Sequence, residues 1–248
     1  MSKLKLLFFA LFSVSWPCHA AEVSVAVAAN FAAPMQRIAA AFEQETGHKA
    51  VLSFGSSGNL YAQIRHGAPF EILLSADSQT PEKLESEGMG LAGTRFTYAI
   101  GTLVLRSKQP GLVDEKGEIL RSGKLERLAI ANPKLAPYGV AAMQTLAQLG
   151  VLSSVQPKLV LGENISQAYQ FVASENAALG LVALSQVMLE GKIAQGSAWI
   201  VPAKLHAPIA QDAILLVKGR DNPVATALLR YLRSEKAKAI MRSYGYTL

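Results

Sequence analysis

The chain has 248 residues, half of them apolar and 17% charged, which is enough to bury a core and excludes a disordered or supercharged protein. Basic residues outnumber acidic ones by 24 to 18, a net charge of +6, and no basic run exceeds two residues. This mild excess argues against a dedicated nucleic-acid surface and suits a small anionic partner.

The first twenty residues have the pattern of a secretory signal peptide. Lys3 and Lys5 precede an apolar run at residues 6–14 that is too short to span a bilayer. Small residues at the cleavage positions predict processing after Ala20, which would lower the net charge to +4. An N-terminal membrane anchor is the weaker alternative, because no later stretch has the length of a transmembrane helix. The single cysteine, Cys18, lies in this segment, so the mature chain can form no disulfide.

The mature chain begins with alternating strand and helix patterns. Short β-rich apolar runs predict strands at residues 23–28, 51–54 and 70–75. Apolar residues at helical spacing predict helices that begin near residues 31, 60 and 81. This β-α-β-α-β order predicts a parallel sheet covered by helices on both faces.

A long strand-like run at residues 96–105 and a charged, glycine-rich loop at 108–123 follow. The alternation then restarts, with strands expected at residues 128–131, 159–161, 179–183 and 199–201 and helices at 140–149 and 166–174. A second long apolar run at 209–217 precedes a last helix at 223–244.

Two α/β units joined by two long strand-like segments predict a bilobal protein with a shared cleft. We expect lobe 1 to comprise residues 21–98 and 210–248, and lobe 2 to comprise residues 99–209. Ligands of such folds bind at the carboxyl ends of the strands, and both lobes would present those ends to the cleft.

The sequence has none of the phosphate-loop, dinucleotide or nucleophile-elbow motifs of common enzymes. Its three mature-chain histidines, His48, His66 and His206, are far apart and lack metal-ligand spacing. Enzymatic activity is therefore the minority interpretation.

Four predicted strand-to-helix turns are short and either polar or glycine-bearing. They are residues 28–30, 55–59, 137–139 and 163–165. Free N–H groups at a helix start bind an anion without help from a cation, and Asn30 and Ser57 add side-chain donors. Four such turns facing one cleft would enclose a small tetrahedral oxyanion. A site made only of donors suits a dianion without a proton and disfavours phosphate, whose proton would meet no acceptor.

Each of these residues also has an ordinary structural explanation. Asn30, Asn59 and Asn164 are common helix N-caps, and serines beside glycines are common turn formers. The prediction of a site therefore depends on the joint placement of the four turns.

Seven stretches, in order along the chain, resemble the periplasmic molybdate-binding proteins of ABC importers. They are residues 27–31 (VAANF), 53–58 (SFGSSG), 67–70 (GAPF), 74–77 (LSAD), 95–101 (RFTYAIG), 132–133 (NP) with 136–139 (APYG), and 179–183 (LGLVA). Together they span essentially all of the mature chain. The resemblance implies a type II periplasmic binding fold with a hinge. It also implies a molybdate or tungstate dianion held by neutral hydrogen-bond donors, without direct coordination of the metal.

The resemblance further implies a ligand set of five residues. Asn30 fills the position of a ligand Ser or Asn, and the adjacent Ala29 offers its backbone N–H. Ser57 matches a ligand serine, Tyr138 offers its backbone N–H and its hydroxyl, and Ile165 offers its backbone N–H.

One position departs from part of the family. Some members have a ligand tyrosine where this sequence has Ala183, which has no side-chain donor. Relatives without that tyrosine can carry one in the Pro-Tyr-Gly turn, and Tyr138 fits that subgroup.

We therefore predict a periplasmic protein that captures molybdate, and tungstate, and delivers it to the membrane permease of an ABC importer. We expect a monomer with no cofactor, no enzymatic activity and no nucleic-acid partner. Two alternatives remain: a protein of the same fold that binds sulfate or another solute, and a secreted hydrolase that uses Ser57.

Overall fold

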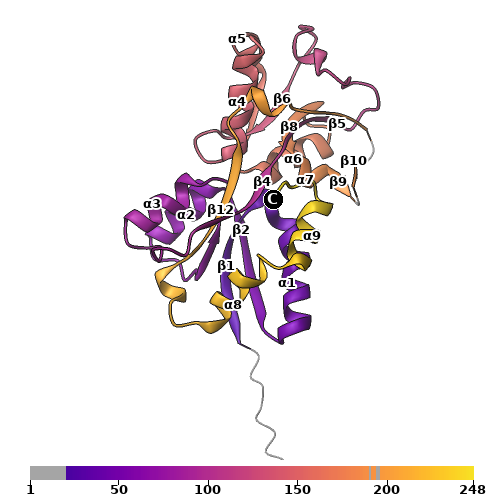
Figure 1. Cartoon of the computed structure of the whole chain (residues 1–248). Helices are drawn as coiled ribbons and strands as arrows, with labels where there is room; N and C mark the ends of the chain where they lie inside the picture. The colour runs from indigo at the N-terminus through magenta and orange to yellow at the C-terminus, as the bar shows by residue number, and fades with distance from the viewer. Residues whose placement is uncertain (1–20, 190, 194–195) are drawn as a thin grey trace, which may run out of the picture.

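The computed structural model describes residues 21–189, 191–193 and 196–248. These residues form two α/β lobes, one above the other in Figure 1. The predicted signal peptide, residues 1–20, lies outside the described residues. Within the described ranges, no helix combines the length and the apolarity needed to cross a membrane.

The first lobe contains a mixed five-stranded sheet in the order β2-β1-β3-β12-β4. Its strands are β1 (Glu22–Ala28), β2 (Lys49–Gly55), β3 (Ile72–Leu74), β4 (Phe96–Gly101) and β12 (Ile209–Leu215). Its helices are η1 (Ala29–Phe31), α1 (Ala32–Thr46), α2 (Ser57–Arg65), α3 (Gln79–Ser86), η5 (Val217–Gly219), α8 (Pro223–Tyr231) and α9 (Glu235–Ser243). Strands β1, β2 and β3 run parallel, whereas β12 runs antiparallel to both of its neighbours.

Apolar spacing explains how α1 and the preceding turn cover this sheet. Four fully buried side chains recur at helical intervals: Phe31, Met35, Ile38 and Phe42. They pack with the alternate valines of β1 in one hydrophobic core. The helix ends at Gly47, which has the positive φ that glycine adopts readily and donates its N–H to the Glu43 carbonyl.

The second lobe contains a mixed sheet in the order β11-β5-β8-β6-β7. Its strands are β5 (Leu103–Ser107), β6 (Leu128–Ala131), β7 (Leu159–Gly162), β8 (Leu179–Ala183) and β11 (Ser197–Ile200). Its helices are η2 (Glu118–Leu120), α4 (Pro137–Gln148), α5 (Leu152–Val155), η3 (Gln156–Lys158), α6 (Ile165–Ala173), α7 (Leu184–Val187) and η4 (Ala203–Leu205). A short hairpin of β9 (Met188–Leu189) and β10 (Lys192–Ile193) follows α7.

Two connections and the carboxyl terminus meet at the waist between the lobes. The chain leaves the first sheet after Gly101, enters the second at Leu103, and returns through β12. The carboxyl terminus also lies at this waist (Figure 1), where Thr247 pairs with Ile100. The predicted lobe division at residues 98/99 and 209/210 stays a prediction.

Three expectations about the elements need correction. The predicted single run at residues 96–105 is two strands that belong to different sheets. Both sheets are mixed, not parallel, because β12 and β5 run against their neighbours. The predicted last helix is two helices, because Ser234 leaves the helical path and caps α9 by accepting the Ala237 N–H at 3.2 Å.

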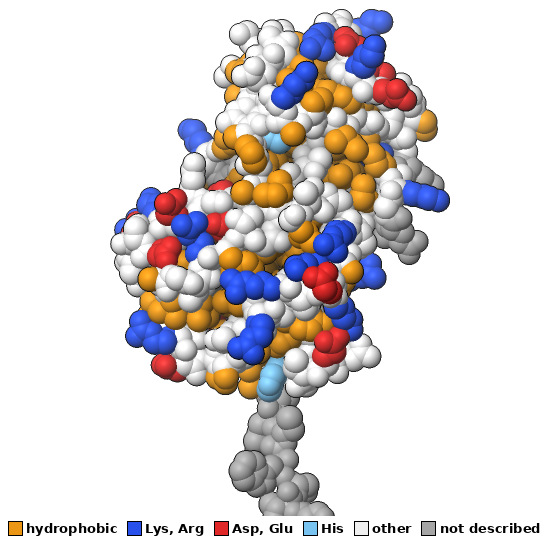
Figure 2. Space-filling model, in the orientation of Figure 1, with side chains coloured by type: hydrophobic (Ala, Val, Ile, Leu, Met, Phe, Trp, Pro, Cys, Tyr) orange, Lys and Arg blue, Asp and Glu red, His pale blue; other side chains and the backbone are white. Residues whose placement is uncertain are grey.

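Charged side chains of both signs are spread over the two lobes on the face drawn in Figure 2. They are not gathered into a single basic area on that face. What sets the waist apart from the rest of the molecule is its buried, hydrogen-bonded polar side chains, and not surface charge.

Candidate functional site

A small cavity lies between the lobes, where strand-to-helix turns of both sheets meet. The space between these turns is small. Its lining comprises residues 28–30, 55–57 and 76 of the first lobe and residues 136–138, 164 and 165 of the second. All five predicted site residues are in this lining: Ala29, Asn30, Ser57, Tyr138 and Ile165.

Ser57 opens α2 and is 1% exposed. Its Oγ accepts the Ser75 hydroxyl and the Ala76 N–H, each at 3.0 Å. The Ser57 hydroxyl lines the cavity, where a bound anion could accept its proton. The next N–H along the helix, that of Gly58, donates to the Leu135 carbonyl at 2.9 Å and joins the two lobes.

The start of α6 leaves one N–H group directed at the cavity. Asn164 is its N-cap, and the side chain accepts the N–H groups of Ser166 and Gln167 at 2.9 and 3.0 Å. The Ala168 N–H makes the first bond within the helix, to the Asn164 carbonyl. The cap therefore satisfies the neighbours of Ile165 and leaves the Ile165 N–H for a ligand.

Tyr138 lies in the first turn of α4, which begins three residues before its predicted start. Pro137 has no N–H and Gly139 donates to the Ala136 carbonyl, so the backbone N–H of Tyr138 is the spare donor of this turn. The Tyr138 ring is 1% exposed, and its hydroxyl oxygen accepts Gln211 Nε2 at 3.3 Å. Burial raises the pKa of Tyr138 well above its usual value, so the hydroxyl keeps its proton.

Asn30 is buried, and its side chain points to the waist and not to a helix end. Nδ2 donates to Gln211 Oε1 at 2.8 Å and to the Tyr246 hydroxyl at 2.9 Å. Its carbonyl accepts hydroxyls from Ser185 of the second lobe and from Tyr246. Both amide hydrogens are thus engaged by Gln211 and Tyr246, in place of the side-chain donation into the cavity that was expected from the sequence. The alternative, a helix N-cap, is not found either, because neither η1 nor α1 has a side-chain cap bond. What Asn30 and Ala29 offer the cavity is the backbone N–H groups of η1.

Ser56 also lines the cavity, and the sequence argument treated it only as a turn former. It is 3% exposed, and its buried Oγ has no hydrogen-bond partner in the described part of the chain. Although Ser56 is the N-cap of α2, its side chain makes no cap bond. A buried hydroxyl without a partner is uncommon and is explained most simply by a ligand.

No Asp, Glu, Lys, Arg or His side chain is among the residues that line the cavity. Across the residues that the structure describes, no group of three His, Cys, Asp or Glu side chains is placed to hold a metal ion. Asp77 stands behind the lining, where its carboxylate accepts the Ser75 hydroxyl at 3.2 Å. Burial raises its pKa, and the charge of Asp212 adds to the increase. The cavity therefore presents neutral hydrogen-bond donors from both lobes.

A wider, open groove adjoins this cavity at the waist. Its lining includes Asp77, Lys134 and Gln144, and it shares Ala76, Ala136 and Pro137 with the smaller space. The spare N–H groups at the starts of η1, α4 and α6, and the Ser57 hydroxyl at the start of α2, belong to residues that line the smaller space, so we place the candidate site there.

A family model described as "Bacterial extracellular solute-binding protein" matches residues 23–247. This protein belongs to that family. A molybdate-binding protein ModA of Azotobacter vinelandii is 57% identical over 93% of this chain and 91% of its own length. One from Rhodobacter capsulatus is 50% identical over 93% of this chain and 90% of its own.

The comparison with solved structures supports the same fold. The periplasmic molybdate-binding protein of Azotobacter vinelandii superposes with a TM-score of 0.89 and 42% sequence identity, covering 91% of this chain and 99% of that one. The predicted two-lobe type II fold is confirmed, and the chain is a solute-binding protein of a transport system.

Three residues at the waist of this solute-binding protein were missed by the sequence argument: Tyr98, Gln211 and Tyr246. Gln211 and Tyr246 lie outside the seven matching stretches. Tyr98 lies within the stretch at residues 95–101, but that stretch by itself indicates no contact with the turns around the cavity. One signal was present, because the polar pair Gln211-Asp212 interrupts an apolar run that already predicted a buried strand. A buried polar pair in such a strand indicates a structural or functional hydrogen-bond network.

Proposed function

We propose that this protein binds molybdate, and tungstate by the same chemistry, and delivers it to the membrane permease of an ABC importer. The observation that carries the proposal is the convergence of hydrogen-bond donors from both lobes on one small, uncharged, buried cavity. The names of the relatives from Azotobacter vinelandii and Rhodobacter capsulatus support molybdate as the solute.

Five residues hold the anion in this proposal. The backbone N–H groups of Ala29, Asn30 and Ile165 donate from helix starts, Ser57 donates through its hydroxyl, and Tyr138 donates through its hydroxyl and its N–H. These bonds reach the oxygen atoms of the oxyanion, so no residue coordinates molybdenum directly. Each bond to a charged acceptor contributes about 1.5–3 kcal/mol net, and several together support sub-micromolar binding after ordering costs.

Size and protonation provide the selectivity. Molybdate and tungstate are larger than sulfate at equal charge. Fixed backbone donors on two lobes favour one distance between the oxygen atoms of the anion, and so select by size. An anion that carries a proton needs an acceptor, and the donors around this cavity provide none. Sulfate, or another solute of the same charge, is the alternative ligand for the same fold.

The cellular setting follows from the N-terminal pattern and from the family. Residues 1–20 act as a signal peptide that is cleaved after Ala20, so the mature protein works in the periplasm as a monomer. Closure of the lobes on the anion presents a joint surface to the permease. No cofactor takes part.

Calorimetric titration of the mature chain, prepared free of metal and sulfate, tests the proposal. We expect one-to-one binding of molybdate and tungstate, weak or no heat from sulfate, and none from phosphate. Ser57→Ala should weaken molybdate binding about tenfold or more, as expected for one lost bond to a charged acceptor. Ser53→Ala, on the same strand–turn segment but outside the cavity lining, is the matched control. The absence of binding heat with both molybdate and tungstate would overturn the proposal.

A further inference from the structure

Gln211 is a fully buried amide on β12, the strand that returns from the second lobe to the first. It does not line the cavity, yet it contacts Asn30 of the first lobe and Tyr138 of the second. In each lobe, a single hydrogen-bonded residue therefore separates the Gln211 side chain from the proposed anion site.

The hydrogen bonds of Gln211 fix which end of its amide faces Tyr138. Oε1 accepts Asn30 Nδ2 at 2.8 Å and the Tyr98 hydroxyl at 3.0 Å. Because Oε1 accepts the Asn30 amide, Nε2 faces the Tyr138 hydroxyl oxygen at 3.3 Å. An amide nitrogen only donates, so the Tyr138 oxygen has to accept.

The direction of the Tyr138 proton follows from this bond. A phenol has one proton, and in the free protein the Tyr246 oxygen lies close enough to accept it. A bound dianion is a charged acceptor and therefore a stronger one than a phenol. The neighbouring Tyr246 oxygen already accepts Asn30 Nδ2. Since Tyr138 lines the cavity, its proton is available to an anion there.

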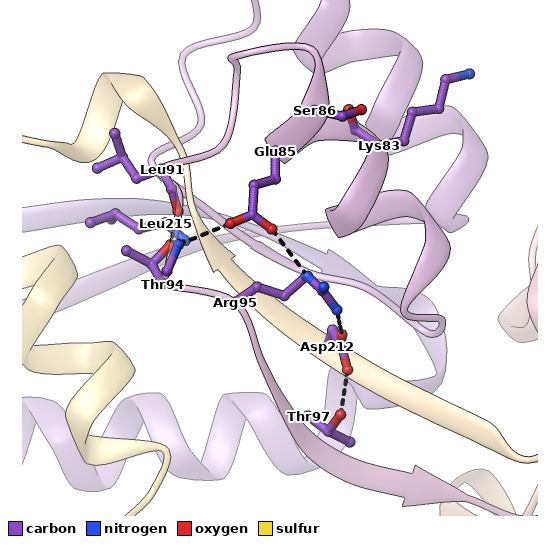
Figure 3. A network of polar contacts seen from close by, with 10 residues as sticks. Lys83, Glu85, Ser86, Leu91, Thr94, Arg95, Thr97, Asp212 and Leu215 are labelled. Carbon is purple, nitrogen blue, oxygen red and sulfur yellow. Dashed lines mark hydrogen bonds and ion pairs between the residues drawn. The ribbon is translucent and has the colours of Figure 1, made fainter.

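The surrounding structure holds Gln211 rigidly. A β-bulge places Gln211 opposite Ala99 and Asp212 opposite Thr97, so Tyr98 is the extra residue whose hydroxyl reaches Gln211. Figure 3 shows how the next residue is anchored: Asp212 accepts Arg95 at 3.0 Å and the Thr97 hydroxyl at 2.6 Å.

Gly101 leaves space for the contact between the two side chains. A Cβ at this position would lie 2.2 Å from the Tyr138 hydroxyl and 2.6 Å from Gln211 Nε2. A side chain at residue 101 would therefore displace one of the two groups.

We propose that Gln211 is a positioning residue that fixes the Tyr138 hydroxyl as a donor toward the bound oxyanion and thereby excludes anions that carry a proton. The inference rests on the proposed function and adds to it a residue that sets specificity without touching the ligand. No covalent step is involved.

The variant Gln211→Glu reverses the hydrogen bond. The new carboxylate still accepts from Asn30 and Tyr98, but it also accepts the Tyr138 proton. The lone pairs of the Tyr138 oxygen are then free to accept a proton from a ligand such as hydrogen arsenate.

The test compares selenate with hydrogen arsenate as competitors of bound molybdate at mildly alkaline pH. These tetrahedral dianions have equal charge and similar size and differ by one proton. The wild type should prefer selenate. In Gln211→Glu both should bind more weakly, but the affinity ratio of arsenate to selenate should rise about tenfold, the value of one hydrogen bond of about 1.4 kcal/mol.

Two further variants isolate the Tyr138 hydroxyl. Gln211→Met removes the donor without adding charge, so it should raise the same ratio, and it carries the test if the buried carboxylate prevents folding. In a Tyr138→Phe background, Gln211→Glu should leave the ratio unchanged, because the hydroxyl through which Gln211 acts is absent.

The outcomes separate the two proposals. A folded Gln211 variant that loses selenate and arsenate affinity in equal proportion would show only the effect of added charge or of a less rigid site. That result would overturn this inference, whereas molybdate binding by the wild type would be unaffected. A wild type that does not bind molybdate overturns the proposed function as well.

Discussion

Ser56 buries a hydroxyl that has no partner, at a position where the backbone is already arranged for helix capping. An unsatisfied buried hydroxyl costs about 1–3 kcal/mol, and the cavity beside it is the site where an anion would satisfy it. The same side chain should therefore oppose stability in the free protein and support it in the complex.

Ser56→Ala tests this division between the two states. We expect the free protein to gain up to about 1 kcal/mol in unfolding free energy, because the substitution removes a buried polar group without a partner. Molybdate affinity should fall about three- to tenfold. Thermal unfolding with and without molybdate measures both effects. A variant that loses stability in both states would assign Ser56 a purely structural role.

Asp77 is a second residue whose burial has a measurable consequence. Its pKa is raised from 3.8 by burial, so the native state holds the proton more tightly than the unfolded state does. Stability due to this group is therefore present at acidic pH and is lost as the pH rises from about 3.8 through the folded pKa.

Asp77→Asn removes the charge but keeps an oxygen that can accept the Thr80 N–H, which Asp77 accepts at 2.8 Å. We expect the variant to unfold at a higher temperature than the wild type at neutral pH. The difference in unfolding temperature should vanish below about pH 3.8, the ordinary pKa of an aspartate. A difference that is constant across pH would show that ionisation of Asp77 has no part in it.

At the scale of elements, the starts of α6, α4 and α2 differ in how their N–H groups are used. In α6 a side-chain cap satisfies the neighbouring groups, in α4 a proline removes one, and in α2 an interlobe bond takes the N–H of Gly58. The cap of α6 therefore contributes to binding as well as to helix stability.

Asn164→Ala separates these contributions when compared with Ser234→Ala, the cap of α9. Each substitution should lower the unfolding free energy by about 0.5–2 kcal/mol. Only Asn164→Ala should also weaken molybdate binding, several-fold, because the start of α6 loses its fixed geometry next to Ile165. Equal affinities in the two variants would limit Asn164 to ordinary capping.

The sequence predicted these starts because each is a local signal: an apolar strand, a short polar turn and helical spacing. It did not predict that β12 would insert between β3 and β4, since the pairing of residues more than one hundred positions apart leaves no local pattern. For the same reason the Asn30 side chain was expected to donate into the cavity, with helix capping as the ordinary alternative, while its partners, Gln211 and Tyr246, come from the far end of the chain.

At the scale of the whole molecule, a small set of direct hydrogen bonds between described residues joins the lobes beside the cavity, the Gln211–Tyr138 bond among them. Gly58 donates to Leu135 at 2.9 Å, the Ser166 hydroxyl to Ala29 at 3.2 Å, and the Ser185 hydroxyl to Asn30 at 2.8 Å. Few bonds hold this closed arrangement, so the bound anion, which contacts both lobes, should determine how often it forms.

Ser166→Ala removes one of these bonds from outside the proposed ligand set. We expect molybdate affinity to fall about two- to fivefold through a less populated closed state. Small-angle X-ray scattering should show that molybdate makes the wild type more compact. Unchanged molybdate affinity in the variant would contradict this account of closure. So would a wild type whose radius of gyration is the same with and without molybdate.

The placement of the chain ends affects how such experiments are built. The carboxyl terminus is paired to β4 at the waist through Thr247, and the adjacent Tyr246 hydroxyl contacts Asn30. An affinity tag or dye fused after Leu248 would lie at the hinge and would alter the equilibrium between the open and closed lobes. The start of β1 lies at the opposite end of the first lobe (Figure 1), so immobilisation through the mature amino terminus leaves the hinge free.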